Sequence, residues 1–133
     1  MKYCADTWFL LTAFGKEQKA TTLVEETKKG KARIIIPVVV FAETIKKLMQ
    51  RGASREIINM FFSGIESSEK IEIAIADKAT AVEAAHISLA YNVPLIDSFV
   101  AATCRLTGCD VLLSADTDYK LLVKRKYLKV QSW

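Results

Sequence analysis

Five carboxylates are the residues most able to do chemistry in this sequence: Asp6, Glu43, Asp97, Asp116 and Asp118. The chain has one histidine, so few other side chains can support proton transfer near neutral pH. Carboxylates packed together repel one another, and in a low dielectric that repulsion is costly unless a cation offsets it. Oxygen ligands without histidine or cysteine favour Mg²⁺ or Mn²⁺. The acids therefore indicate a divalent-metal site that activates water.

Buried strands are expected just before several of these acids. The expected strands are short and apolar, at residues 3–5, 33–36, 71–75 and 111–113, with a last alternating strand at 127–131. Asp6 follows the first strand directly, and Asp116 and Asp118 follow the strand at 111–113. Because Asp6 also precedes an apolar run at 8–11, we expect its carboxyl group to be buried and partnered.

Segments of helical periodicity separate the strands. Helices are expected at about 17–29, from 38 to Gly52, from Asp97 to Gly108 and from 119 to about 123. Two more are expected to begin at N-caps. The first follows Ser54, with Ile57, Ile58, Phe61 and Phe62 facing inward, and the second follows Asp77 and ends at Asn92 in the left-handed conformation. Alternation of strands and helices predicts a three-layer α/β/α fold. Its mostly parallel sheet should have four to five strands and helices on both faces. We expect residues 1–133 to form a single domain.

One edge of such a sheet is where the acids should meet. Ligands of parallel α/β sheets bind outside the carboxyl ends of the strands. Glu43 lies on the first turns of the helix that follows the second strand, and Asp97 lies at the start of another helix. All five acids can therefore gather at this edge, although they are far apart in sequence.

Each acid also has an ordinary structural interpretation. Asp97 is well placed to be a helix N-cap, Glu43 to be a solvated helix residue, and Asp116 to cap a turn that contains Asp118. Asp6 is the hardest to interpret in this way, because its apolar neighbours predict burial. Taken together, these interpretations require four coincidences at one edge of the sheet.

Composition excludes several classes of protein. Of 133 residues, 51% are hydrophobic and 26% charged, which is typical of a globular chain. The longest apolar run, 34–42, contains Pro37 and is far shorter than the roughly 20 residues that span a bilayer, so no membrane association is expected. Three cysteines without paired spacing (Cys4, Cys104, Cys109) predict neither a disulfide framework nor a zinc site. We expect the three cysteines to be small, reduced core side chains of a protein in the reducing cytoplasm.

The acidic motifs resemble those of the PIN-domain ribonucleases, and above all the toxin component of VapBC toxin–antitoxin pairs. The similar segments are Asp6-Thr7 with the apolar run 9–11, the apolar helix bearing Glu43, residues 97–102 (Asp-Ser-Phe-Val-Ala-Ala) and residues 112–119 (Leu-Leu-Ser-Ala-Asp-Thr-Asp-Tyr). Each motif alone is weak, but their order and spacing are specific and extend over essentially the whole chain.

The resemblance implies a function and a set of roles. Asp6, Glu43, Asp97 and Asp116 would be catalytic residues that bind Mg²⁺ (or Mn²⁺), with Asp118 as an auxiliary acid. Ser114, and less strongly Thr7, would support the site by hydrogen bonding. The implied activity is hydrolysis of RNA phosphodiester bonds, by a homodimer that pairs with a VapB-type antitoxin. Trp8 departs from the family, which often has Asn or Ser there. We expect Trp8 to pack in the core, the alternative being stacking on a base.

Basic residues adjoin the acids in sequence. Lys46, Lys47 and Arg51, with Arg55, follow Glu43, and a second basic set (Lys120, Lys124, Arg125, Lys126, Lys129) follows Asp118. They suit an RNA backbone, although a solvated helix face is the alternative for each lysine. The net charge is +4. Without the five clustered acids, nineteen basic residues face ten acids, so the rest of the surface carries +9.

Other functions remain open at the level of sequence. A catalytically silent PIN-like module would bind RNA or protein, and a housekeeping nuclease would share the metal site without an antitoxin. A phosphotransfer site built on Asp116-Thr117-Asp118 is disfavoured, because only fifteen residues follow it. The Phe61-Phe62 pair and the apolar stripe from Val38 to Met49 favour core packing, with dimerisation or antitoxin binding as the alternative.

Overall fold

The computed structural model describes all 133 residues and contains one five-stranded sheet. Its strands are β1 (Lys2–Ala5), β2 (Arg33–Pro37), β3 (Ile71–Ala74), β4 (Val111–Leu113) and β5 (Val130–Gln131). The spatial order is β3-β2-β1-β4-β5, and every neighbouring pair is parallel. The strand that precedes Asp6 is therefore the central one.

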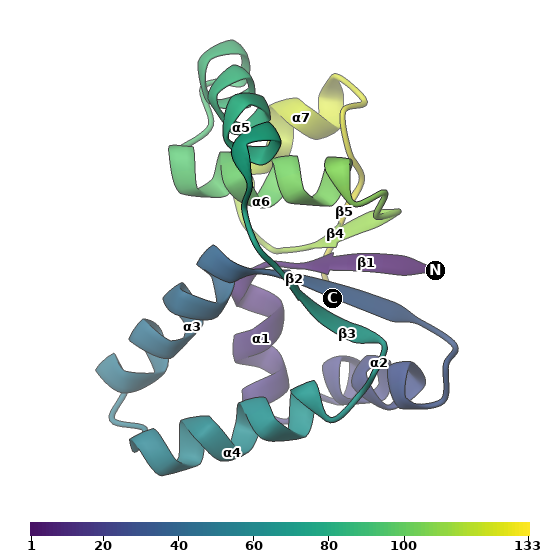
Figure 1. Cartoon of the computed structure of the whole chain (residues 1–133), viewed down its shortest axis with the longest axis vertical. Coiled ribbons are helices and arrows are strands. Elements are labelled where there is room, and N and C mark those ends of the chain that lie inside the picture. Colours follow the sequence, from purple (N-terminus) through teal and green to yellow (C-terminus); the bar gives the residue numbers. More distant parts are fainter.

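Seven α-helices cover the two faces of this sheet. They are α1 (Thr7–Phe14), α2 (Gln18–Lys28), α3 (Val38–Gln50), α4 (Arg55–Glu66), α5 (Lys78–Tyr91), α6 (Leu95–Leu106) and α7 (Lys120–Lys124), the last preceded by a 3₁₀ turn, η1 (Thr117–Tyr119). Helices α1 to α4 lie on one side of the sheet and α5 to α7 on the other (Figure 1). This confirms the expected three-layer α/β/α architecture.

The sheet is buried from both sides, which explains its sequence. Ile34, Ile35 and Ile36 are consecutive in β2 and all buried, and so are Leu112 and Leu113 in β4. A strand covered on both faces has no polar side, so its apolar residues need not alternate with polar ones. The same burial fixes β1 and β4 firmly at the centre of the molecule.

Residues at helix ends determine where α5 and α6 begin and end. The Asp77 carboxylate accepts the backbone N–H of Thr80 at 2.9 Å, and Asn92 adopts the left-handed conformation with φ 52°. Both features confirm the sequence expectation. Helix α6, however, begins at Leu95 after Pro94, so Asp97 is in its first turn and is not its N-cap. The Asp97 side chain is consequently free for another role.

The structure adds one helix and corrects three local expectations. The apolar run 8–11, for which no element was expected, belongs to α1, which Asp6 caps by accepting the N–H of Thr7. Ile57 is 51% exposed, because Ile58 and Phe62 occupy the inward face of α4. Ile75 is 83% exposed, since β3 ends at Ala74. The last strand is only Val130–Gln131, because the Tyr127 N–H is bonded to Leu122 in the turn after α7.

No single helix is long and apolar enough to cross a membrane; α5 and α6 reach that length and composition only as a pair, with a 119° bend between them.

Candidate metal centre

The carboxyl ends of β1 and β4 bring two distant segments together. Ala5 pairs with Leu113, and the Asp6 N–H donates to the Leu113 carbonyl at 3.1 Å. Ser114 therefore lies beside Asp6. Its hydroxyl donates to Asp6 Oδ2 at 2.6 Å and accepts the N–H of Asp116 at 3.0 Å. One side chain thus connects the acid after β1 with the acid after β4.

Three carboxylates form a closely spaced set at this edge. Oxygen atoms of Asp97, Asp116 and Asp118 all lie within 4.8 Å of one another. Asp97 comes from the first turn of α6, while Asp116 caps η1 by accepting the N–H of Asp118 at 2.9 Å. The capping role foreseen for Asp116 is thus combined with a place in the acidic set. Asp118, expected to be auxiliary, is a full member of it.

Asp6 lies at the base of the site, outside the closely spaced set. It is only 7% exposed, which confirms the predicted burial. Its carboxylate accepts the Ser114 hydroxyl and the Thr7 N–H, the latter at 2.8 Å. Burial raises the pKa of Asp6, the two hydrogen bonds oppose that rise, and the charges of Glu43 and Asp116 add to it. Asp6 therefore shares the electrostatic field of the other acids.

Glu43 is near enough to influence Asp6 but has its own partner. Its carboxylate lies 3.2 Å from the Lys47 ammonium, one turn further along α3. The structure therefore does not bring Glu43 into the closely spaced set. Lys47, expected to contact RNA, is paired with Glu43 here.

The net negative charge at this edge has no basic partner. None of the ion pairs in the structure involves Asp6, Asp97, Asp116 or Asp118. Burial, followed by the charges of Asp116 and Asp6, raises the pKa of Asp97 to about 7. Burial and close, uncompensated carboxylates both favour the neutral form of a carboxyl group.

The donor set fits Mg²⁺ or Mn²⁺. All its ligand atoms are oxygens, and Asp116 and Asp118 are exposed, which leaves positions for water and phosphate. Two buried hydroxyls beside the acids, Thr7 Oγ1 and Tyr119 Oη, have no hydrogen-bond partner. Burial, and then the charges of Asp6, Asp97 and Asp116, raise the pKa of Tyr119. Sequence reasoning missed Tyr119, whose only signal is its position three residues after Asp116.

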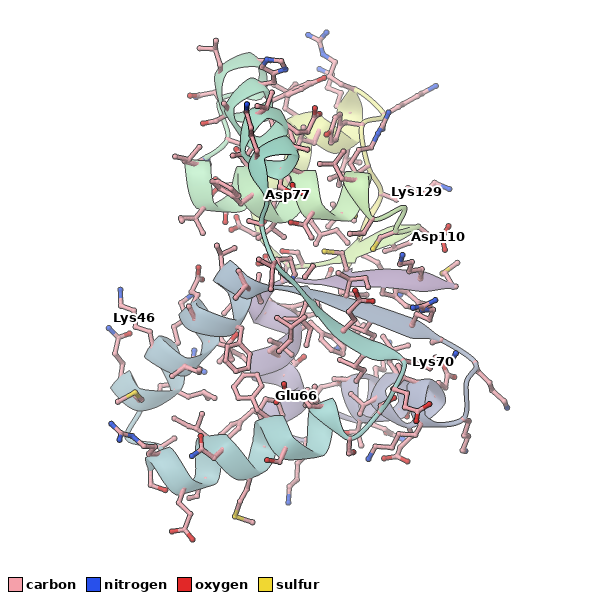
Figure 2. All side chains as sticks on the ribbon, viewed as in Figure 1. Lys46, Glu66, Lys70, Asp77, Asp110 and Lys129 are labelled. Carbon is pink, nitrogen blue, oxygen red and sulfur yellow. The ribbon has the colours of Figure 1, made fainter.

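The predicted basic residues divide between two ends of the molecule. Lys46 lies on α3, and Lys120 begins α7 directly after η1. Lys129 is far from Lys46 and close to Asp110 (Figure 2). Lys129 precedes Val130, which pairs with Leu112, so Lys129 lies level with the first residue of β4, whereas Asp116 follows the carboxyl end. The expectation that Lys129 flanks the acids is therefore wrong.

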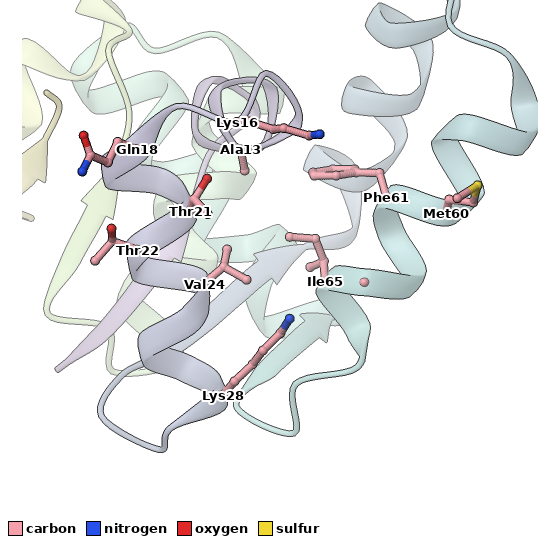
Figure 3. Close-up of a pocket in the computed structure, with 11 residues that line it drawn as sticks. Ala13, Lys16, Gln18, Thr21, Thr22, Val24, Lys28, Met60, Phe61 and Ile65 are labelled. Carbon is pink, nitrogen blue, oxygen red and sulfur yellow. The ribbon is translucent and has the colours of Figure 1, made fainter.

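The aromatic residues near α1 and α4 pack internally. Trp8 is partly buried and packs against the core, with its ring 5.0 Å from that of Trp133. Phe61 packs on Phe14 with ring centroids 5.3 Å apart. Between α2 and α4 a pocket of about 550 Å³ remains, lined by Val24, Phe61, Ile65 and eight further residues (Figure 3).

Comparisons with known proteins agree with this geometry. No curated protein matches the chain. VapBC2 from Rickettsia felis, solved bound to a DNA fragment from its promoter, is similar with a TM-score of 0.72 and 16% identity over 100% of this chain and 99% of that one. VapBC-1 from nontypeable Haemophilus influenzae has a TM-score of 0.67 and 16% identity, covering 100% and 98%.

A third similar structure is that of a toxin from another bacterium. VapC20 from Mycobacterium tuberculosis, a sarcin–ricin loop cleaving toxin, has a TM-score of 0.66 and 17% identity, covering 90% of this chain and 93% of that one. At these identities the likeness shows the fold. The PIN domain family model matches residues 3–124, which is most of the sequence. The chain therefore belongs to the PIN domain family.

Proposed function

We propose that the chain is a Mg²⁺- or Mn²⁺-dependent endoribonuclease and the toxin of a VapBC-type pair, with residues 1–133 as one catalytic domain. The observation that carries this proposal is the set of Asp97, Asp116 and Asp118, whose oxygens lie within 4.8 Å of one another at the carboxyl edge of a parallel sheet. Family membership and the toxins among similar structures support it.

The side chains at this edge have separable roles in the proposal. Asp97, Asp116 and Asp118 hold the ion. The buried Asp6 and, from α3, Glu43 add negative charge that attracts it. When bound, the ion supplies activation of water and neutralisation of charge on the phosphate. Ser114 keeps Asp6 and Asp116 in fixed relative positions through its two hydrogen bonds. Lys46, Arg51 and Lys120 contact the RNA backbone, with Lys47 doing so after it leaves Glu43.

Cleavage of short RNAs by the purified protein tests the proposal. We expect cleavage with Mg²⁺ or Mn²⁺, none with EDTA, and a loss of at least about 100-fold in Asp97→Asn and Asp6→Asn, because each substitution removes one negative ligand or support. Glu66→Gln, which removes an exposed acid at the end of α4, is the matched control and should retain full activity. Cleavage that persists in EDTA, or in Asp97→Asn, would contradict the proposal. RNA binding without cleavage would indicate a silent binding module.

The toxin role predicts a VapB-type antitoxin. Similar structures from R. felis and H. influenzae are VapBC assemblies. In this chain the pocket between α2 and α4 has an apolar floor, and Met60 on its rim is 69% exposed, so this pocket is our proposed contact for the antitoxin. A small protein encoded beside this gene should co-purify with the chain. Loss of this protein in Met60→Glu, and its retention in the control Lys2→Ala, which lies outside the pocket, would support the assignment. A housekeeping nuclease would have no such partner.

We also propose a homodimer. Leu95 and Ile96 are about half exposed at the start of α6, where a second copy would cover them. Light scattering on the purified protein should give twice the 14.8 kDa mass of the chain. Ile96→Glu should reduce it to the single-chain value.

A further inference from the structure

All three cysteines of the chain meet between β1 and α6. Cys4 belongs to β1, Cys104 to the last turns of α6, and Cys109 to the turn that leads into β4. Their Sγ atoms all lie within 4.8 Å of one another. Cys4 and Cys104 are buried as expected, but Cys109 is partly exposed. Sequence spacing could not reveal this cluster, because Cys4 is about a hundred residues away from the others.

The end of α6 builds half of the cluster by a defined turn. The Cys109 N–H donates to the Cys104 carbonyl at 3.0 Å, and the Gly108 N–H donates to the Arg105 carbonyl at 3.2 Å. Gly108 has φ 69°, so it takes the left-handed conformation that this Schellman motif requires. Such a motif brings the residue after the glycine against the third-last helical residue. Here those two residues are Cys109 and Cys104.

A hydroxyl group and an ammonium group lie beside Cys109 and can stabilise its thiolate. The Thr107 hydroxyl lies 3.3 Å from Cys109 Sγ. The Lys2 ammonium donates to the Thr107 carbonyl, which holds its positive charge beside the cluster. A thiolate, rather than a thiol, is the form that binds metals.

We propose that Cys4, Cys104 and Cys109 form a three-sulfur site for a thiophilic cation of the Zn²⁺, Cd²⁺ or Cu⁺ class. Three sulfurs around one ion at about 2.3 Å stand roughly 3.8–4.0 Å apart, so the observed spacing requires side-chain shifts of less than about 1 Å. The soft sulfur set selects against Mg²⁺, which suits the oxygen site instead. The two sites therefore take different ions.

A cavity gives the ion a path to the sulfurs. It has a volume of about 690 Å³, and Cys104 and Cys109 are among the residues that line it. Arg105, Lys126 and Lys129 also line it, with Asp110 as the one acid, so the lining carries a net positive charge that offsets the net negative charge of three thiolates on a divalent ion. The cavity leaves room for water as a fourth ligand. Bound there, the ion would tie β1, which ends before Asp6, to α6, which carries Asp97.

Cadmium titration of the full-length, reduced protein tests the site. For this titration, Asp97→Asn and Asp116→Asn are introduced into the chain, so that the carboxylates of the acidic site do not compete for Cd²⁺. We expect one Cd²⁺ per chain, a thiolate-to-cadmium charge-transfer band in the ultraviolet, and displacement by Zn²⁺. At an ion concentration a hundredfold above Kd, Tm should rise by roughly 5–10 °C, because only the folded chain holds the three sulfurs together.

Two cysteine variants and one control make the result decisive. Cys109→Ala, at the most exposed of the three positions, should weaken Cd²⁺ binding at least about 50-fold while the circular dichroism spectrum stays that of the folded protein. Cys104→Ala, at a buried position, should likewise weaken Cd²⁺ binding. Asp110→Asn, beside the cluster, should bind normally, since it removes an oxygen and no sulfur. Unchanged Cd²⁺ binding in Cys109→Ala would overturn the proposal. So would anaerobically isolated protein in which two of the three thiols are already joined as a disulfide.

Discussion

Ser114 is the residue on which the geometry of the acidic site most depends. It is buried, it donates to Asp6 and it accepts from Asp116, so no alanine can replace either contact. Ser114→Ala leaves the buried Asp6 carboxylate with one hydrogen bond fewer. We expect the free energy of unfolding, measured in urea, to fall by about 2 kcal/mol. Mg²⁺ binding, measured by calorimetry, should weaken as well.

A serine elsewhere in the chain supplies the control for this prediction. Ser67 donates to the Gly64 carbonyl at 2.7 Å on the exposed end of α4. Water replaces that contact readily, so Ser67→Ala should change stability by less than about 0.5 kcal/mol and leave Mg²⁺ binding intact. Equal losses in both variants would mean that Ser114 has no special role in the site.

The raised pKa of Asp97 predicts a pH dependence of stability in metal-free protein. Its pKa is 3.8 in an unstructured chain and about 7 in the fold. Between these values the folded state binds more protons than the unfolded state, so stability falls as pH rises from about 4 to 7. Because Asp97 is only partly buried, we expect a loss of only about 1–2 kcal/mol.

Urea unfolding in EDTA at a series of pH values measures this effect. Asp97→Asn should flatten the decline, and the difference between the two proteins isolates Asp97 from other groups. Asp77, whose pKa is lowered chiefly by the Thr80 N–H, acts in the opposite direction but equally in both proteins. Mg²⁺ added at pH 7.5 should restore stability to the unsubstituted protein only. If that protein gained stability between pH 5 and 7, relative to Asp97→Asn, the assignment of the raised pKa would be wrong.

For single residues, the sequence predicted burial better than it predicted side-chain contacts. The burial of Asp6 followed from its apolar neighbours on both sides, and the structure confirms it. Asp118 belongs to the closely spaced set because the short turn η1 directs the Asp118 carboxylate to Asp97 and Asp116. No local sequence pattern shows this. The pairing of Glu43 with Lys47 has the i, i+4 spacing of an ordinary helix pair. That spacing was visible in the sequence.

Among the elements, the connection between α5 and α6 positions Asp97. Asn92 ends α5 with φ 52° and ψ 44°, a left-handed conformation that a β-branched residue adopts only with strain. Asn92→Val should therefore lower the free energy of unfolding by about 1–2 kcal/mol. Asn92→Gly should stay within about 0.5 kcal/mol of the unsubstituted protein, because glycine adopts this conformation freely. Thermal and urea unfolding measure both.

A measurement of Mg²⁺ binding adds a second check on this connection. If the turn positions Asp97, Asn92→Val should weaken Mg²⁺ binding as well as stability, while Asn92→Gly should not. Asn92→Val with unchanged stability would show that the backbone relaxes out of the left-handed region.

Most helices and strands were predictable because their ends carry specific residues. Ser54 and Asp77 both accept backbone N–H groups at helix starts, as their positions indicate. Helix α1 was missed, because its apolar run lacks the polar face that marks a surface helix; it is packed beneath the sheet. The start of α6 was placed too late, since Pro94 rather than Asp97 precedes its first turn.

On the scale of the whole molecule, parallel order and layers followed from the alternation of strands and helices. The spatial order of the strands did not, because no local pattern states which strand is central. That order determines which basic residues flank the acids. Lys46 lies on α3, on the flank of the acidic edge, whereas Lys129 is at the amino end of the sheet (Figure 2). Sequence adjacency to Asp118 therefore misplaced Lys129, whereas Lys120 begins α7 directly after η1.

The separation of Lys46 and Arg51 from Lys126 and Lys129 predicts which of these two pairs RNA contacts. We expect the logarithm of RNA affinity to fall linearly with the logarithm of salt concentration, with a slope of about −0.7 per phosphate neutralised on a single strand. Combined Lys46→Ala and Arg51→Ala should make the slope shallower by about 1.4, since two contacts are lost. Lys126→Ala with Lys129→Ala removes the same charge from the other end and should leave the slope unchanged. Fluorescence anisotropy of a labelled RNA, with Asp97→Asn in every protein to prevent cleavage, measures each slope. Equal slopes in the two double variants would mean that RNA responds to the total charge of the molecule and not to the basic residues beside the acids.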